Sequence, residues 1–164
     1  MIANALSTPR NSPVPGSSAI AGWALLIMDG LTIAVAQKDI VTIEIVSSLR
    51  PTEQDDNKIG WFVANGLDRW PVYCLNRYFA TMPALAQSSR VFILMRSKDH
   101  TFGLAGTQVS LLAADTDLLV TPLPVCLTSP GSPLIGLALY RDGVVAVIQA
   151  ETIPENILSW GTSS

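Results

Sequence analysis

The sequence predicts an all-β fold built from small closed barrels, and three observations lead to that prediction. Short apolar runs rich in β-branched residues follow one another from Trp23 onward, turn-forming residues separate these runs, and patterns with helical spacing are scarce. So many strands in a chain of 164 residues favour closure, because a closed barrel has no unpaired strand edges that could aggregate. The length itself allows one domain, or two small lobes that share one core.

Ten of these runs are predicted strands, each six to eight residues long. They span residues 23–28, 31–36, 40–46, 59–64, 69–75, 90–95, 100–106, 109–114, 133–140 and 143–149. Short connections such as Asp29-Gly30 and Asn65-Gly66-Leu67-Asp68 carry residues that tolerate the backbone angles of hairpin turns. Many consecutive strands are therefore expected to pair antiparallel.

Longer connections interrupt the hairpins at residues 48–58 and 121–133. Proline cannot donate a hydrogen bond to a strand ladder, so these proline-containing stretches are predicted to be loops or crossovers between lobes. Helical structure is limited to a few short turns. One is expected within residues 76–87, before Pro83, and a short terminal helix is expected over residues 153–160.

Residues 1–18 are rich in Pro, Ser and Asn without apolar periodicity, and they are predicted to be a flexible leader to a domain over residues 19–164. The domain begins with an apolar stretch, Ala19 to Ala36, that is about long enough to cross a bilayer. Asp29 lies near its middle, where insertion costs about 2.5 to 3.5 kcal/mol, and Gly30 follows it in a turn-forming pair. Two strands are expected in place of a membrane helix, without direct membrane insertion.

The composition argues against several classes of protein. Apolar residues make up 49% of the chain and charged residues 14%, a balance that indicates a folded body with strands covered on both faces. The net charge of -3 and the absence of a basic cluster with interleaved aromatic residues argue against nucleic acid as a partner. Cys74 and Cys126 fit no zinc or redox spacing and are too few for a disulfide framework, which indicates a cytoplasmic protein with unpaired thiols.

A hydrolase would need a nucleophile and a base. His100, the only histidine, could serve a hydrolase if it met Cys74 or Cys126 in space. The favoured interpretation is a solvated turn histidine and thiols that act as small hydrophobic groups. Asp115 and Asp117 lie two residues apart, and a solvated turn is the favoured interpretation for them as well.

A small β-barrel that binds a ligand is the other alternative, and it would need several polar groups that converge on a lumen. The chain carries no calcium-loop pattern and no glycine-rich phosphate loop, so neither a metal nor a cofactor is predicted. The residues therefore favour a non-catalytic binding module, which depends on the shape of its surface.

Four blocks of sequence, in this order, resemble the CheW-like adaptor family of bacterial chemotaxis. They are ALLIMDGLTIAVAQKDIVTIEI (24–45), IGWFVANGLDRWPVYCLNRYF (59–79), SRVFILMRSKDHTFGLAGTQVSLL (89–112) and PLIGLALYRDGVVAVIQAETI (133–153). The resemblance implies two small five-stranded barrel lobes that share an apolar core, without a cofactor. It also implies a scaffold that couples a histidine kinase of the chemotaxis type to receptors or other signalling proteins.

Three departures from the family pattern are visible. Family members that dock on chemoreceptors usually carry Asn-Leu-Arg-Gly ahead of the central hairpin, whereas residues 63–69 here keep Asn and Arg only out of that register. Cys74 stands where an aspartate is expected after Pro-Val, and an acidic residue is missing near Thr107. These departures favour a divergent adaptor that serves twitching motility or another accessory pathway.

The predicted partner-binding residues lie in the central hairpin. Asn65, Asp68 and Arg69 are the expected polar contacts at its tip, and Leu67 and Trp70 are the expected apolar anchors. The alternative interpretation places Trp70 in the core and treats the other four residues as an ordinary solvated turn.

Overall fold

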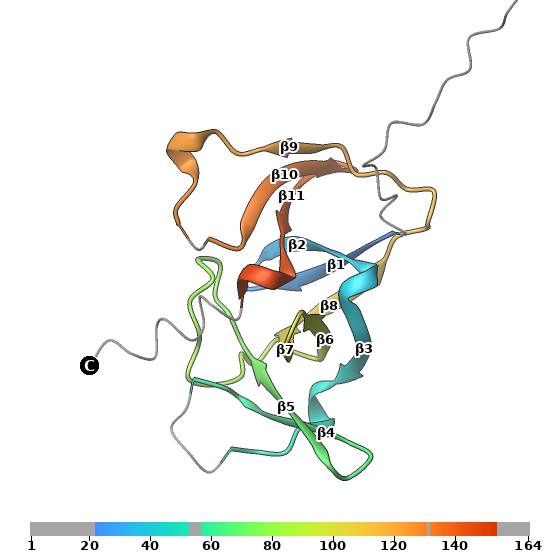
Figure 1. Ribbon diagram of the computed structural model, residues 1–164, viewed down its shortest axis with the longest axis vertical. Helices are drawn as coiled ribbons and strands as arrows, with labels where there is room; N and C mark the ends of the chain where they lie inside the picture. The colour runs from blue at the N-terminus through green and yellow to red at the C-terminus, as the bar shows by residue number, and fades with distance from the viewer. Residues whose placement is uncertain (1–21, 53–56, 131, 154–164) are drawn as a thin grey trace, which may run out of the picture.

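A computed structural model describes residues 22–52, 57–130 and 132–153 of the chain (Figure 1). The predicted leader, residues 1–18, lies outside the described residues, as do residues 154–160 of the predicted terminal helix.

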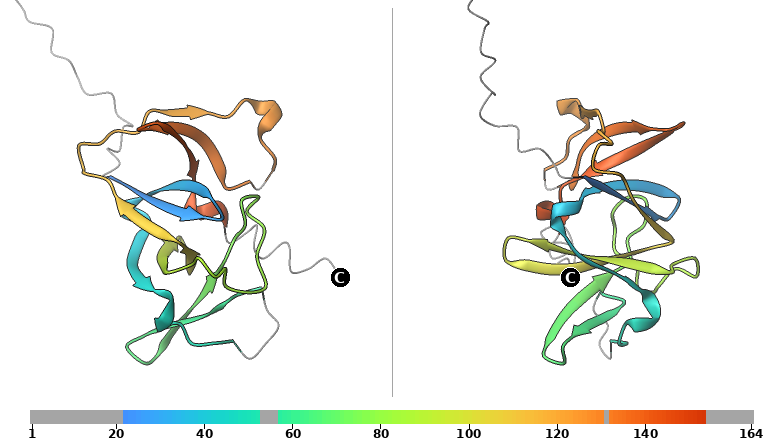
Figure 2. Two further views of the ribbon diagram at one scale, coloured as in Figure 1. Left: turned by 180° about the vertical axis from the view of Figure 1, so that it is seen from behind. Right: turned by 90° about the vertical axis from the view of Figure 1, so that its right-hand side faces the viewer.

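The described residues form two antiparallel-rich sheets, one in each of two lobes that lie one above the other (Figures 1 and 2). The six-stranded sheet has the order β8 (Gln108–Leu111), β1 (Trp23–Met28), β2 (Leu31–Ala36), β11 (Gly143–Ile148), β10 (Leu134–Tyr140) and β9 (Val120–Pro122). The five-stranded sheet has the order β3 (Ile40–Ile45), β6 (Val91–Ser97), β7 (His100–Gly106), β5 (Asp68–Tyr73) and β4 (Gly60–Ala64). The prediction of an all-β fold with two lobes is confirmed. The expected closure of the barrels is not complete among the described residues, because each strand order is open, with edges at β8 and β9 and at β3 and β4.

Four short 3-10 turns lie in these ranges. They are η1 (Gln37–Asp39), η2 (Val46–Ser48), η3 (Val125–Leu127) and η4 (Ala150–Thr152). The prediction of a helical turn within residues 76–87 is wrong. The Asn76 side chain instead accepts hydrogen bonds from the backbone N–H groups of Tyr78 and Ala80, and such side-chain bonds compete with helix formation.

All ten predicted strands are present, and an eleventh was missed. Strand β9 lies at the start of the stretch 121–133, which was predicted to be a loop or crossover because of its prolines. It is the edge strand of its sheet, so Pro122 needs to donate no hydrogen bond on its outer side. This short strand gives the lobe six strands where five were expected.

The hairpin predicted in place of a membrane helix is confirmed. Strands β1 and β2 pair antiparallel with Met28 opposite Leu31, and the two turn residues, Asp29 and Gly30, have φ angles of 46° and 74°. Both angles match a tight hairpin turn of the kind that suits the twist of the strands. Among the described residues, no helix is long and apolar enough to cross a membrane.

The apolar core has three parts, because the two faces of β1, β2 and β11 pack against different neighbours. One face turns into the six-stranded lobe, where Trp23, Leu25 and Val147 are buried. The opposite face meets the other sheet, and here the cluster contains Leu26, Met28, Ile33, Val35, Leu75, Ile93, Met95, Phe102, Leu104, Ala146, Ile148, Ala150 and Ile153. A third cluster fills the five-stranded lobe. The two lobes therefore share an apolar core, as predicted.

Candidate partner-binding site

The predicted site lies on the hairpin of β4 and β5, at the end of the molecule farthest from β9 and β10 (Figures 1 and 2). The strands pair in register from Gly60–Val72 to Ala64–Asp68, which leaves Asn65, Gly66 and Leu67 as the connecting loop. Asn65 and Gly66 have φ angles of 50° and 78°. Asparagine and glycine are the residues that most readily take such angles, so the local sequence itself reverses the chain here.

The tip of this hairpin projects an apolar side chain into solvent. Leu67 is 89% exposed, although its aliphatic side chain would gain free energy from burial. Asp68 and Arg69 are also exposed, and within the described parts of the chain their side chains form no ion pair with each other or with a neighbour. The tip thus offers one apolar group flanked by two opposite charges.

Trp70 connects this tip to the core. It lies opposite Phe62 on the neighbouring strand, and the two rings stack with their centroids 6.1 Å apart and an interplanar angle of 24°. Phe62 in turn meets the fully buried Phe92 edge to face at 5.4 Å. Because Trp70 itself is only half-buried, it packs on the core and still presents part of its ring to solvent.

Sequence reasoning missed a second aromatic residue of the hairpin. Lys58 Nζ lies 4.6 Å from the ring centroid of Trp61, a distance at which a cation is attracted to an aromatic face. The backbone of Trp61 also pairs with Arg50, which ties the hairpin to the segment after β3. A lysine three residues before a tryptophan is a weak signal, because the spacing alone does not show that the two side chains meet.

The residues considered for a hydrolase lie on separate parts of the structure. Cys74 is buried just after β5, with its Sγ 3.9 Å from the Met82 Sδ, and Cys126 is exposed in η3. His100 is exposed at the start of β7. Strand β5 runs parallel to β7 with Tyr73 beside Leu104, so Cys74 lies about five residues along the sheet from His100, or roughly 15 Å.

Two carboxyl groups have shifted pKa values, and both lie away from the hairpin tip. The backbone N–H of Arg77 donates a hydrogen bond of 2.9 Å to Asp29, and this bond, with the nearby guanidinium group, lowers the pKa of Asp29. Burial raises the pKa of Asp39, with a further contribution from the charge of Glu151. In the three described ranges, no group of His, Cys, Asp or Glu side chains is placed to hold a metal ion.

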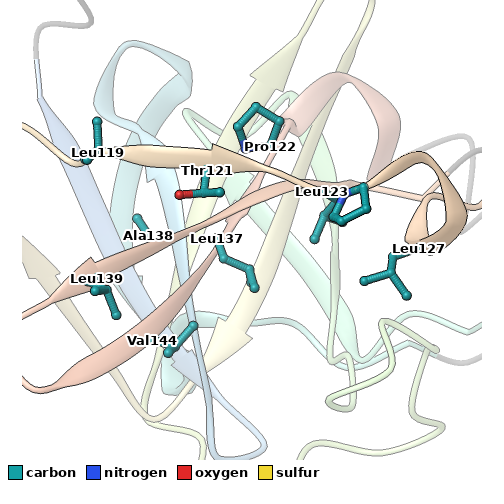
Figure 3. Close-up of a pocket in the computed structure, with 10 residues that line it drawn as sticks. Leu119, Thr121, Pro122, Leu123, Leu127, Leu137, Ala138, Leu139 and Val144 are labelled. Atoms are coloured by element: carbon teal, nitrogen blue, oxygen red, sulfur yellow. The ribbon is translucent and has the colours of Figure 1, made fainter.

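An apolar groove on the other lobe was also missed by sequence reasoning. It has a volume of about 380 Å³ and lies on the outer face of β9, β10 and β11 (Figure 3). Its lining consists of Leu119, Thr121, Pro122, Leu123, Pro124, Leu127, Leu137, Ala138, Leu139 and Val144. The signal in the sequence was the set Leu119, Leu123 and Leu127 around Pro122 and Pro124. Residues 121–133 were instead interpreted as a loop or a crossover between lobes.

This architecture is similar to that of a protein of known structure. The structure is similar to the crystal structure of the scaffolding protein TtCheW from Thermoanaerobacter tengcongensis, with a TM-score of 0.60 over 81% of this chain and 91% of that one. The chain has a CheW-like fold. The sequence identity is 16%, no protein-family model matches the chain, and no curated protein matches it. The CheW-like fold is therefore formed here by a sequence of low identity to that neighbour.

The coverage shows how much of the molecule follows the CheW-like fold. Because nine-tenths of TtCheW is matched, both lobes are included and not one barrel alone. The neighbour is a scaffolding protein. The CheW-like fold was expected from the four sequence blocks, and this expectation is confirmed.

Proposed function

We propose that this protein is a non-catalytic adaptor in a chemotaxis-type signalling pathway of the bacterial cytoplasm. It would couple a histidine kinase of the chemotaxis type to receptors or other signalling proteins by protein–protein contacts alone. The observation that carries this proposal is the CheW-like fold of both lobes, shared with a scaffolding protein. Two unpaired cysteines agree with a reducing compartment.

The partner-binding surface in this proposal is the β4–β5 tip, formed by Asn65, Leu67, Asp68, Arg69 and Trp70. Exposed apolar side chains with adjacent charges are typical of contact surfaces, and aromatic and arginine residues contribute most often to binding free energy. The half-buried Trp70 would hold the tip rigidly on the core, which lowers the entropy lost on binding. The Asn-Leu-Arg-Gly sequence is absent from its usual position ahead of the hairpin. This absence supports a role in an accessory pathway, such as twitching motility, over docking on chemoreceptors of the usual kind.

Two alternatives to the adaptor receive less support from the geometry. A hydrolase needs a histidine within hydrogen-bond reach of its nucleophile, and the separation of His100 from Cys74 is several times larger. A ligand-binding barrel needs polar groups that converge on a cavity, whereas Thr121 is the one polar side chain in the lining of the apolar groove.

Changing the tip should weaken capture of partners without unfolding the protein. The variant combines Leu67→Ser, Asp68→Asn and Arg69→Gln, which removes the exposed apolar group and both charges. We expect capture of a chemotaxis-type kinase or receptor from a lysate of the source bacterium to fall about tenfold or more, a loss of about 1.4 kcal/mol. The measurement is quantitative mass spectrometry of the captured proteins.

The matched control changes a different hairpin tip. Lys98→Gln with Asp99→Asn alters two exposed charges between β6 and β7 and should leave capture unchanged. Both variants should keep their free energy of unfolding within about 0.5 kcal/mol per substitution. Equal capture by the tip variant and the unmodified protein would contradict the proposed surface, and recovery of no signalling protein at all would contradict the proposed function.

A further inference from the structure

The outer face of β9, β10 and β11 leaves an unusual amount of aliphatic surface in water. Of the side chains that line its groove, Leu119 is 86% exposed, Leu139 75%, Leu127 66%, Val144 59% and Leu137 38%. This face continues the side of β11 that is buried against the other lobe, and β10 and β9 follow β11 in the strand order on the side away from that lobe (Figure 1). Such a continuous patch marks a contact surface more often than a scattered set of single side chains does.

The area of this face matches what one subunit contributes to a stable dimer. The five side chains above, together with the exposed Thr121, Pro122, Pro124 and the 89% exposed Val125, offer a surface comparable to the roughly 800 Å² per partner of a standard-size interface. A face of this size is larger than the few hundred Å² of apolar patch that a monomer usually exposes. The size alone therefore favours a macromolecular occupant over a small ligand.

Both ends of the groove carry exposed leucine side chains. Figure 3 shows Leu119 and Leu139 at one end, Leu127 at the other, and Leu137 between them. A two-fold axis near Leu137 would place the projecting Leu139 of one copy at the end that carries Leu127 in the second copy, and the reverse. Closed two-fold contacts of this kind are the commonest way in which identical chains associate.

The charges around the groove fit the same arrangement. None of the ten lining residues is ionisable. The nearest charged residues in sequence are Arg141 and Asp142, in the turn beside Leu139 and Val144, and the exposed Asp117, two residues before Leu119. Residues 123–130 at the opposite end carry no charge. Under the two-fold axis, the charged end of each copy meets an uncharged end of the other, so no like charges face each other.

We propose that the protein forms a two-fold symmetric dimer through the outer face of β9, β10 and β11, with Leu137 near the axis. This proposal does not depend on what the β4–β5 tip binds. Because that tip lies at the far end of the molecule, the dimer leaves both tips open (Figure 1). Two tips in one particle would raise the apparent affinity for any partner that itself presents several binding sites.

Sedimentation equilibrium of the full chain tests the dimer. The unmodified protein is expected to show twice the 17.5 kDa mass of one chain at about 50 µM. Leu139→Glu places a charge in the apolar contact and should yield a monomer. Its melting temperature should equal that of the unmodified protein at a dilution where that protein is also a monomer, since the residue is exposed in one copy. The control, Leu111→Glu, changes a leucine that is 60% exposed on β8, the opposite edge of the same sheet, and should stay dimeric.

Each other outcome overturns the proposal in an identifiable way. If the unmodified protein is itself a monomer and Leu139→Glu lowers its melting temperature by several degrees, another segment of the same chain covers the groove. If the unmodified protein is a monomer and Leu139→Glu leaves its melting temperature unchanged, the face is free and open to a different partner. A dimer that persists in Leu139→Glu and dissociates in Leu111→Glu would place the contact on β8.

A cross-link tests the orientation of the two copies. Cys126 lies in η3 beside Leu127 and is exposed, so Leu139→Cys should approach the Cys126 thiol of the second copy. Mild oxidation of this variant should form a dimer linked through residues 139 and 126, which peptide mapping identifies, whereas Leu111→Cys should form no such link. A link between two copies of residue 139 alone would overturn the proposed axis at Leu137.

Discussion

Replacing Phe92 by alanine is expected to lower the free energy of unfolding by about 4 kcal/mol. The side chain is completely buried in the five-stranded lobe, and its ring meets Phe62 edge to face. Alanine would remove most of the ring and leave a cavity in a cluster that also contains Val72 and Ala105. Chemical denaturation followed by far-ultraviolet circular dichroism measures the change.

The control for Phe92→Ala is Leu67→Ala at the hairpin tip. Leu67 is 89% exposed, so its truncation should change the free energy of unfolding by no more than about 0.5 kcal/mol. Because Phe92 supports Phe62, and Phe62 stacks on Trp70, we also expect Phe92→Ala to loosen the tip. A loss of stability below about 1 kcal/mol would mean that the lobe interior is not packed as described.

Gly106→Ala should destabilise the contact between the two lobes by about 3 kcal/mol. Gly106 ends β7 in one sheet, and an added Cβ would collide with the backbone oxygen of Ile27 and lie 2.5 Å from Leu26 Cδ1, both in β1 of the other sheet. The next residue, Thr107, donates a backbone hydrogen bond of 2.7 Å to that same oxygen of Ile27. The chain therefore cannot give way without loss of a bond between the lobes.

The same substitution at Gly143 is the matched control. A Cβ at Gly143 would meet its nearest heavy atom, the Tyr140 oxygen, at 3.8 Å, which is an ordinary contact distance. Gly143 is exposed at the start of β11, so Gly143→Ala should leave stability within about 0.5 kcal/mol. Equal melting temperatures for the two variants would contradict the close approach of β7 and β1.

The strands were predictable because their signals are local. The run at residues 100–106 was predicted with the bounds that β7 has, and the Asp29-Gly30 turn was predicted from two residues that tolerate positive φ angles. Such signals need no knowledge of the rest of the chain. The same holds for the β4–β5 hairpin, where Asn65 and Gly66 reverse the chain by their own backbone preferences.

The features that were not predicted correctly from the sequence depend on contacts that the local sequence pattern does not show. Strand β9 exists because Val120–Pro122 pairs with residues of β10 that lie 16 positions or so further along the chain, and its proline argues locally against a strand. The groove beside it combines that strand with β10, β11 and η3, so no single stretch of sequence could indicate it. The missing helical turn at residues 76–87 reflects the competing hydrogen bonds of Asn76.

The sequence by itself determined the all-β class, ten of the strands and the turn at Asn65, because strand periodicity and turn chemistry act within a few residues. Only the tertiary structure decided which apolar residues are buried. Trp70 became half-buried through its stack on Phe62, and Leu139 stayed in water because none of the described elements packs over it. The exposure of a side chain depends on which distant segment of the chain packs against its strand. The alternation of apolar and polar residues along one strand does not identify that segment.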